Sequence, residues 1–208
     1  IRNSYPYVRL VFGTFAIHRV PEMLYNVLRT GKRVFVTEET KGEIAEGLPV
    51  YRDRDFKMWL PIMYGCNNFC SYCVVPYVRG RERSRSPEAV IAEAKELIAM
   101  GAKEITLLGQ NVNSYGKTLD EPMSFAELLR EIEKIDGLKR IRFMNSHPKD
   151  LSDELIEVMK NSKKICRHLH LPLQSGSSRV LKVMNRRYDK EGYLALVDRI
   201  KTAIPDIS

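Results

Sequence analysis

The stretch GCNNFCSYC, residues 65–73, places three cysteines at the spacing C-x3-C-x2-C directly after an apolar run at residues 58–64. Three thiolates on one short loop can close around a single soft metal centre. A structural zinc ion normally takes four protein ligands, whereas an iron-sulfur cube held by three cysteines leaves one iron open for a substrate or cofactor. Gly65 lets the backbone turn sharply before the first cysteine. The spacing therefore favours an iron-sulfur centre, with zinc, a disulfide or inert thiols as the alternatives.

The residues around the cysteines resemble a known family. The pattern C-x3-C-x-aromatic-C, with Tyr72 as the aromatic residue, is similar to that of radical S-adenosylmethionine (SAM) enzymes, and GCNNFCSYCVVPYVRG at residues 65–80 resembles their methylthiotransferase branch. Three further segments most resemble the members that act on isopentenyladenosine in tRNA: RSR at 83–85, NSHP at 145–148 and LPLQSGS at 171–177. The resemblance covers nearly the whole chain.

The resemblance implies an α/β architecture. The expected fold is a partial (β/α) radical SAM barrel with about four of six strands, preceded by the remnant of an α/β N-terminal methylthiotransferase domain. We expect the C-terminal part of that first domain plus a linker at residues 1–50, and an incomplete radical SAM core at residues 58–208. Residues 37–57 form a mostly polar segment that contains Gly42 and Pro49, and we interpret this segment as the linker.

The resemblance also implies the chemistry. Cys66, Cys70 and Cys73 would hold a [4Fe-4S] cluster whose open iron binds SAM. One electron from an external donor, flavodoxin or similar, would release a 5'-deoxyadenosyl radical that attacks C2 of isopentenyladenosine next to the anticodon. A second [4Fe-4S] cluster would supply the sulfur of the methylthio group, and its ligands are not in this chain. The implied protein is a monomeric tRNA transferase, and this chain alone is expected to cleave SAM at best.

Composition is that of an ordinary globular chain. Of its 208 residues 44% are hydrophobic and 29% charged, and the net charge is +8, from 34 Lys and Arg against 26 Asp and Glu. No apolar run reaches the ~20 residues that span a bilayer, and the first residues do not resemble a signal peptide. Four cysteines, three of them clustered, argue against a secreted disulfide framework. We therefore expect a cytoplasmic protein with no membrane partner.

Apolar runs of strand length alternate with amphipathic helices along most of the chain. Strands are expected at residues 7–12, 34–36, 58–64, 104–109, 140–145 and 168–173. Serine is a favoured helix N-cap, and it predicts helices that begin after Ser86, Ser124, Ser152 and Ser177. Two more helices are expected. One is opened by Pro21, with Met23, Leu24, Val27 and Leu28 on one stripe, and the other is ended by Pro205, with Leu194, Val197 and Ile200 on its stripe. Strand and helix alternating in this way predict a parallel sheet with helices packed against it.

Polar residues follow each expected strand of the core. In parallel folds of this kind, chemistry gathers beyond the carboxyl ends of the strands. By resemblance, Tyr72 lies near the adenine of SAM, and four residues at the other strand ends are candidate SAM contacts: Gln110, Asn111, Ser146 and Gln174. Turn chemistry and helix capping are the alternative for each of them taken singly.

Basic residues gather after the cysteine loop and again near residue 186. A positive surface favours a polyanionic partner such as RNA. The candidate RNA contacts are Arg79, Arg81, Arg83, Arg186 and Arg187. Arg85 continues the first run, and a solvated face is the alternative interpretation of both runs.

Four other side chains, three histidines and one cysteine, carry metal-binding or redox chemistry. His168 and His170 share one face of the last expected strand, where hydrogen bonding is favoured over a second metal site. His147, before Pro148, is interpreted as a turn residue. Cys166 is interpreted as a buried small hydrophobe.

Other functions compatible with the sequence fall into two groups. Within the same family, the substrate could be an aspartate of a ribosomal protein or threonylcarbamoyladenosine in tRNA. In a different class, the chain could be a zinc-stabilised RNA-binding module without catalysis. The proportion of iron to zinc in the purified protein would separate the two groups.

Overall fold

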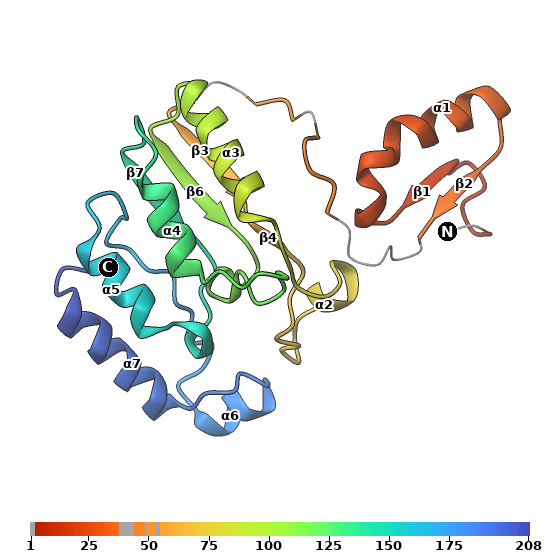
Figure 1. The fold of residues 1–208 in the computed structure, drawn as a ribbon. Helices are drawn as coiled ribbons and strands as arrows, with labels where there is room; N and C mark the ends of the chain where they lie inside the picture. The colour runs from red at the N-terminus through yellow and green to blue at the C-terminus, as the bar shows by residue number, and fades with distance from the viewer. Residues whose placement is uncertain (1–2, 38–43, 49, 53–54) are drawn as a thin grey trace.

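Three parallel strands organise the larger part of the chain. In the computed structural model, β3 (Lys57–Pro61), β6 (Glu104–Leu108) and β7 (Arg140–Phe143) lie side by side in that order (Figure 1). Both pairings are parallel, with Trp59 opposite Thr106 and Thr106 opposite Arg142. The central strand β6 is buried over its first four residues, as expected for a parallel strand covered on both faces.

The structure describes residues 3–37, 44–48, 50–52 and 55–208. Part of the expected linker at residues 37–57, including Gly42 and Pro49, lies outside these ranges. Among the described residues, no helix has both the length and the apolar character needed to cross a lipid bilayer.

The first expected strand of the core, at residues 58–64, is divided in two. Ile62 separates β3 from β4 (Met63–Tyr64), which pairs antiparallel with β5 (Arg83–Ser84). The amide of Ile62 still donates to the carbonyl of Leu108 at 2.9 Å, and its carbonyl accepts from the amide of Arg85 at 2.9 Å. The chain therefore leaves the parallel sheet at this residue and enters a hairpin, with α2 (Val75–Val78) in the connection.

The serine caps predicted from the sequence are confirmed at all four helices. In each, the serine oxygen accepts a hydrogen bond from the backbone amide three residues later. The helices are α3 (Pro87–Ala99), α4 (Phe125–Glu133), α5 (Asp153–Asn161) and α6 (Ser178–Val183). At α4 the side chain of Glu127 also accepts from the amide of Ser124, which completes a capping box.

The last helix, α7 (Lys190–Ala203), is capped by Asp189 and ends before Pro205. Its buried residues are Leu196 and Ile200, whereas Leu194, expected in the buried stripe, is 48% exposed. Helices α3, α4, α5 and α7 pack against one another in succession (Figure 1).

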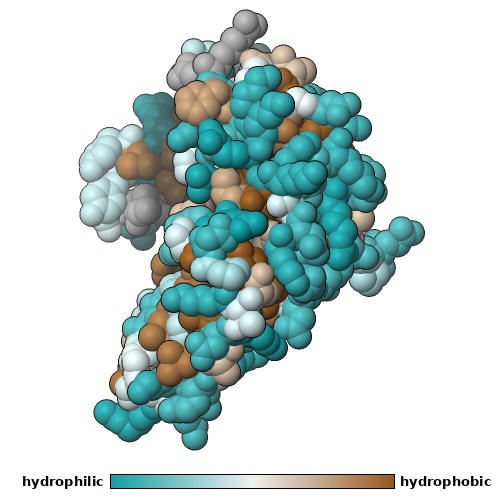
Figure 2. Space-filling view, turned by 90° about the vertical axis from the view of Figure 1, so that its left-hand side faces the viewer, coloured by the Kyte–Doolittle hydropathy of each residue, from teal (hydrophilic) through white to brown (hydrophobic). Residues whose placement is uncertain are grey.

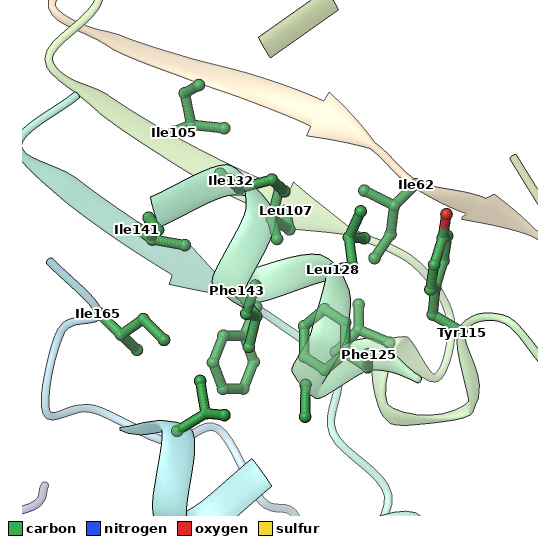
Figure 3. Close-up of a cluster of buried hydrophobic side chains, with 14 of the residues drawn as sticks. Ile62, Ile105, Leu107, Tyr115, Phe125, Leu128, Ile132, Ile141, Phe143 and Ile165 are labelled. Atoms are coloured by element: carbon green, nitrogen blue, oxygen red, sulfur yellow. The ribbon is translucent and has the colours of Figure 1, made fainter. Parts of the chain in front are cut away.

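The core lies between the sheet and these helices. Side chains from β6 and β7, among them Ile105, Leu107 and Phe143, meet Leu128 and Ile132 of α4 (Figure 3). Burying a side chain of this size contributes about 1.5–3 kcal/mol. Phe125 and Phe143 meet edge to face with ring centroids 5.2 Å apart. This packing fixes the carboxyl ends of β6 and β7 in place.

The fourth strand expected in the core, at residues 168–173, does not form. Among the described residues, the segment just before it pairs with β7 through one isolated parallel bridge, between Ile141 and Ile165. Pro172 has no N–H to donate to a neighbouring strand, and the amide of Leu169 donates to the carbonyl of Ser208 instead.

Seen from the side of β7, α5 and α7, the surface is mostly hydrophilic, with patches of hydrophobic side chains between the hydrophilic ones (Figure 2).

The N-terminal residues form a small unit of their own. β1 (Leu10–Phe12) and β2 (Val34–Val36) pair in parallel, joined by η1 (Thr14–Arg19) and α1 (Val20–Thr30). In α1, Met23 and Val27 are buried, but Leu24 and Leu28, expected on the same stripe, are 46% and 75% exposed. The unit touches the rest of the chain where Thr14 Oγ1 donates to the carbonyl of Val78 at 3.3 Å.

Candidate functional site

The cysteine loop, residues 65–73, begins where β4 ends. Gly65 adopts a φ of +70°, and the amide of Cys66 donates to the carbonyl of Gly80 at 3.2 Å. On the same side, the amide of Glu82 donates to Oδ1 of Asn67 at 3.2 Å. These contacts hold the start of the loop against residues 80–82, which lead into β5.

All three cysteines of the loop are free thiols in a partly dry environment. Cys66 and Cys70 are 8% and 9% exposed, and Cys73 is half-buried. Burial raises the pKa of the Cys66 thiol, although the amide of Asn68 donates to its Sγ at 3.5 Å. A bound metal deprotonates a thiol outright, so this raised pKa describes the metal-free loop.

The ligand set fits an iron-sulfur cube better than a single ion. In the part of the chain that the structure describes, no three His, Cys, Asp or Glu side chains are placed to hold one ion. The cysteines of a four-iron cube bind three different iron atoms, so their sulfurs do not need to meet at one point. Three soft thiolates are the set that iron-sulfur clusters select.

Of the four strand-end residues expected to contact SAM, two are buried at the ends of β6 and β7 and two lie on the surface. Asn111 and Ser146 are buried, at 1% and 2% exposed, whereas Gln110 and Gln174 lie on the surface. Asn111 Nδ2 donates to Asp150 Oδ2 at 2.7 Å. Asn111 Oδ1 and Ser146 Oγ are buried with no hydrogen-bond partner among the described residues.

His147 is a buried functional candidate, not only the turn residue expected from the sequence. It is 5% exposed, and its Nδ1 accepts from the amide of Lys149 at 3.3 Å, which caps η3 (Pro148–Asp150). Burial and Arg186 lower the pKa of His147 to about 4, so the ring is neutral near pH 7. Its proton then sits on Nε2, which is buried and has no partner among the described residues.

Unpaired buried polar atoms therefore gather at this end of the sheet. Asn113, in η2 (Val112–Ser114), is 8% exposed and also lacks partners for its side-chain amide within the described residues. A buried unsatisfied group costs about 1–3 kcal/mol, and such groups concentrate where a ligand satisfies them. Sequence reasoning missed His147 and Asn113, although both lie within or beside the polar strand ends it identified.

Glu82, which lies within the arginine run, is a third residue that the sequence did not identify. It is 6% exposed, accepts from Ser114 Oγ at 2.7 Å, and burial raises its pKa. Nearby, Asp150 pairs with Lys117 at 2.6 Å, and Lys117 and Asn111 hold its pKa below the usual range. Lys117 and Asp150 line a cavity of about 450 Å³ between the first turns of α4 and α5.

The expected RNA contacts separate into exposed and buried residues. Arg79, Arg81 and Arg187 are exposed, and the guanidinium of Arg81 lies 4.5 Å from the ring centroid of Phe69. Arg83 is half-buried over the ring of Phe15. Arg186 is 5% exposed and donates to Cys70 Sγ at 3.2 Å, so it belongs to the cysteine site and not to the surface.

Arg85, which continues the first basic run, is also removed from the surface. It is 6% exposed and forms ion pairs with Glu46 and Glu93, each at 2.6 Å. Its guanidinium also donates to the carbonyl of Pro61 at 2.7 Å. Arg85 therefore stabilises the packing of α3 against β3 and has no route to a polyanion.

Cys166, His168 and His170 are the other candidates for metal or redox chemistry, and His170 lies beside the site, because its carbonyl accepts from the amide of Ser146 at 3.2 Å. Cys166 is half-buried, not fully buried as expected. His170 Nδ1 accepts from the amide of Asn145 at 3.2 Å, and His168 Nδ1 lies 3.2 Å from Ser208 Oγ. These contacts agree with the expected hydrogen-bonding role, although the segment is not a strand.

Comparison with known proteins places this site in a family. The model of the Radical SAM superfamily matches residues 60–208. A curated relative from Lachnoclostridium phytofermentans, named tRNA-2-methylthio-N(6)-dimethylallyladenosine synthase, is 60% identical over 208 residues, which is all of this chain and 46% of the relative. A relative of the same name from Clostridium perfringens is 56% identical over 208 residues, again 46% of its length. The chain thus spans a little under half the length of these relatives.

Solved structures share the fold at low sequence identity. The radical SAM methyltransferase TsrM from Kitasatospora setae, with tryptophan and a SAM analogue bound, matches with a TM-score of 0.57 and 22% identity, over 77% of this chain and 32% of that one. The cobalamin-dependent SAM radical enzyme OxsB matches with a TM-score of 0.55 and 14% identity, over 70% and 22%. These likenesses confirm the expected α/β partial barrel. Because the superfamily model matches well over half of the chain and includes the cysteine loop and the ends of β6 and β7, the chain belongs to the Radical SAM superfamily.

Proposed function

We propose that this chain is the SAM-cleaving core of an enzyme that adds a methylthio group to dimethylallyladenosine, also called isopentenyladenosine, in tRNA. The observation that carries the proposal is the 53–60% identity, over 99–100% of the chain, to relatives named for that reaction. The three free cysteines at the mouth of the sheet support it, because they match the ligand count of an iron-sulfur cube with one open iron.

In this proposal the chain's residues hold the cofactors at the carboxyl end of the sheet. Cys66, Cys70 and Cys73 bind a [4Fe-4S] cluster. When bound, the cluster and SAM supply a carbon radical able to remove hydrogen from an unreactive carbon. Ser146 Oγ and the Nε2–H of His147, both buried and unpaired within the described residues, hydrogen-bond the polar groups of SAM and of the adenosine.

The surface around the cysteine loop supports an RNA partner. Tyr72 and Tyr77 are 54% and 72% exposed, and Arg79 and Arg81 are exposed beside them. Phe69 lies under Arg81 and meets Tyr77 edge to face, with ring centroids 5.9 Å apart. Aromatic rings that stack bases, next to arginines that contact phosphates, suit the single-stranded loops in which RNA is read. This mixture favours RNA over a ribosomal protein aspartate as the substrate.

The test is the product formed by the full-length enzyme that contains this chain, prepared without oxygen, because this chain alone is expected only to cleave SAM. The enzyme is incubated with SAM, a low-potential one-electron donor and tRNA that carries dimethylallyladenosine, and the digested nucleosides are analysed by mass spectrometry. We expect methylthiolated dimethylallyladenosine, and no product on the same tRNA without its dimethylallyl group. Parallel reactions with threonylcarbamoyladenosine tRNA and with ribosomal protein test the alternatives. Product in either of those reactions, with none on dimethylallyladenosine, would contradict the proposal.

A further inference from the structure

A short segment after α6, residues 183–188, is fastened to the cysteine loop. The amide of Ser71 donates to the carbonyl of Met184 at 3.2 Å, and Ser71 Oγ donates to the carbonyl of Val183 at 2.6 Å. Asn185 Nδ2 donates to the carbonyls of Asn68 and Phe69 at 3.2 and 3.0 Å. Residues more than 110 positions apart in the sequence are therefore joined by hydrogen bonds on both sides of Cys70.

Arg186 lies at the centre of this contact. Its Nη1 donates to Cys70 Sγ at 3.2 Å and lies 3.5 Å from the hydroxyl of Tyr72. Its Nε donates to the hydroxyl of Tyr188 at 3.1 Å, and its guanidinium lies 5.4 Å from the centroid of that ring. Contacts with Cys70, Tyr72 and Tyr188 thus hold the guanidinium next to the sulfur of one expected cluster ligand.

This buried arginine has no carboxylate partner within the described residues. Arg186 is only 5% exposed, yet none of the ion pairs found there includes it. Buried charges are normally paired, because removing a guanidinium from water without a counter-ion is costly. The group placed to balance it is Cys70, once a bound metal deprotonates its thiol.

The backbone of the segment is also held in an unusual conformation. Asn185 and Arg187, the two neighbours of Arg186, adopt φ of +57° and +59°. Left-handed conformations cost about 1–3 kcal/mol for residues other than glycine and persist where the surroundings enforce them. Here they aim the guanidinium of Arg186 inward while Arg187 stays exposed.

We propose that Arg186 is a positioning residue for the cluster, which fixes Cys70 and raises the reduction potential of the bound iron-sulfur centre. The inference rests on the proposed function, since it takes the three cysteines as cluster ligands. Reduction adds one electron, supplied by a low-potential donor, and thus one negative charge at the cluster. A fixed positive charge and an N–H···S hydrogen bond stabilise that reduced state more than the oxidised one.

The first experiment measures the potential directly. The electron-resonance signal that responds to SAM is titrated against potential in the wild-type protein, Arg186→Met, Arg186→Lys and the control Arg179→Met, an exposed arginine on α6. We expect Arg186→Met to lower the equilibrium constant for reduction about tenfold, which is ~59 mV for a one-electron couple. Arg186→Lys is expected to recover part of the loss, and Arg179→Met to match the wild type. An Arg186→Met protein with the wild-type potential overturns the inference.

A second measurement does not depend on the cluster. It tests whether Arg186 holds Cys70 in place even if the Arg186→Met protein does not bind iron. Amide hydrogen exchange is followed over residues 66–73 in the cluster-free protein. Arg186→Met, and Asn185→Gly, which keeps the left-handed backbone accessible but removes the amide contacts, are expected to exchange at least tenfold faster there than Arg179→Met. Equal exchange rates overturn the role in holding Cys70. Failure of the wild type to form a SAM-responsive cluster would instead refute the proposed function.

Discussion

Gly65 lies directly against the backbone of Arg81: a β-carbon at residue 65 would stand 2.1 Å from the carbonyl oxygen of Arg81. The same glycine adopts a φ of +70°, which side chains rarely tolerate. Both constraints act at the residue before the first cysteine, so the shape of the cysteine loop depends on this close approach of two backbones.

Replacing Gly65 by alanine is therefore expected to displace the cysteine loop. The left-handed conformation alone costs about 1–2 kcal/mol, and the clash with Arg81 adds to it. Gly47→Ala is the matched control, because Gly47 has a φ of +67° but no atom of the described residues lies within 4 Å of an added β-carbon. We expect iron content after anaerobic reconstitution to fall sharply in Gly65→Ala and to stay near the wild-type level in Gly47→Ala. Equal iron contents would show that the approach to Arg81 is not needed.

Substitution of single cysteines distinguishes those that bind the cluster from those that do not. Cys66→Ala, Cys70→Ala and Cys73→Ala are each expected to lose the iron and the visible absorption of the cluster, because each removes one of three ligands. Cys166→Ala is the control, since Cys166 lies half-buried outside the loop. Iron analysis and absorption spectra of oxygen-free material check this. Retention of full iron in any of the three loop variants contradicts the ligand assignment.

Arg85 is expected to be the most stabilising arginine of the basic run. Its side chain is 7% exposed and pairs with Glu46 and Glu93, whose side chains are 36% and 18% exposed. Removing one partner of a buried ion pair costs about 3–5 kcal/mol, because the other charges are left uncompensated. Arg85→Ala is thus expected to lower the free energy of unfolding by roughly that amount in urea denaturation.

The matched control for Arg85 is an arginine in a surface pair. Arg130 contacts Glu154 at 2.6 Å, but the two side chains are 47% and 40% exposed. Exposed pairs contribute about 0–1 kcal/mol, so Arg130→Ala is expected to change unfolding little. A similar loss in both variants would contradict the difference in burial.

His147 is expected to make the protein less stable in mild acid. Burial, and the positive charges of Arg186, Lys149 and Arg187, hold its pKa at about 4, against 6.5 for an exposed histidine, with Asp150 acting in the opposite direction. The unfolded chain then binds the proton more readily than the folded one between these values. Stability due to His147 is therefore full above pH 6.5 and decreases as the pH falls toward 4.

The variant His147→Asn isolates this effect. Asparagine can still accept a hydrogen bond from the amide of Lys149 but does not titrate in this range. We expect the free energy of unfolding to fall less steeply from pH 6.5 to pH 4 in the variant than in the wild type. Glu82 and Asp150 titrate in both proteins, so their contributions cancel in the difference. Parallel curves would show that His147 is not held neutral.

Arg79 and Arg81 are expected to contribute to the salt dependence of RNA binding. Each phosphate contact to single-stranded RNA changes the slope of log affinity against log salt by about 0.7. The double variant Arg79→Ala with Arg81→Ala is expected to flatten the slope by about 1.4 units. Arg199→Ala, on α7 and paired with Asp153, is the control. An unchanged slope in the double variant removes the two arginines from the interface.

Local signals in the sequence predicted much of this structure. The four serine caps, the capping box of Ser124 and Glu127, and the strands that became β6 and β7 follow from contacts within a few residues. The fourth core strand could not be predicted in this way, because a strand exists only if a partner accepts its hydrogen bonds. The stripe of α7 was misjudged for a similar reason: which face is buried depends on where α5 lies.

By itself, the sequence determined the cysteine trio, the alternation of strands and helices and the family, since these depend on spacing along the chain. Tertiary structure decided the roles of the charged and polar residues. It moved Arg85 into a buried ion-pair network, placed Arg186 on the sulfur of Cys70 and enclosed His147 as a neutral donor. The physical reason is that the burial and pairing of a charge depend on residues that are distant in sequence, and no local pattern records them.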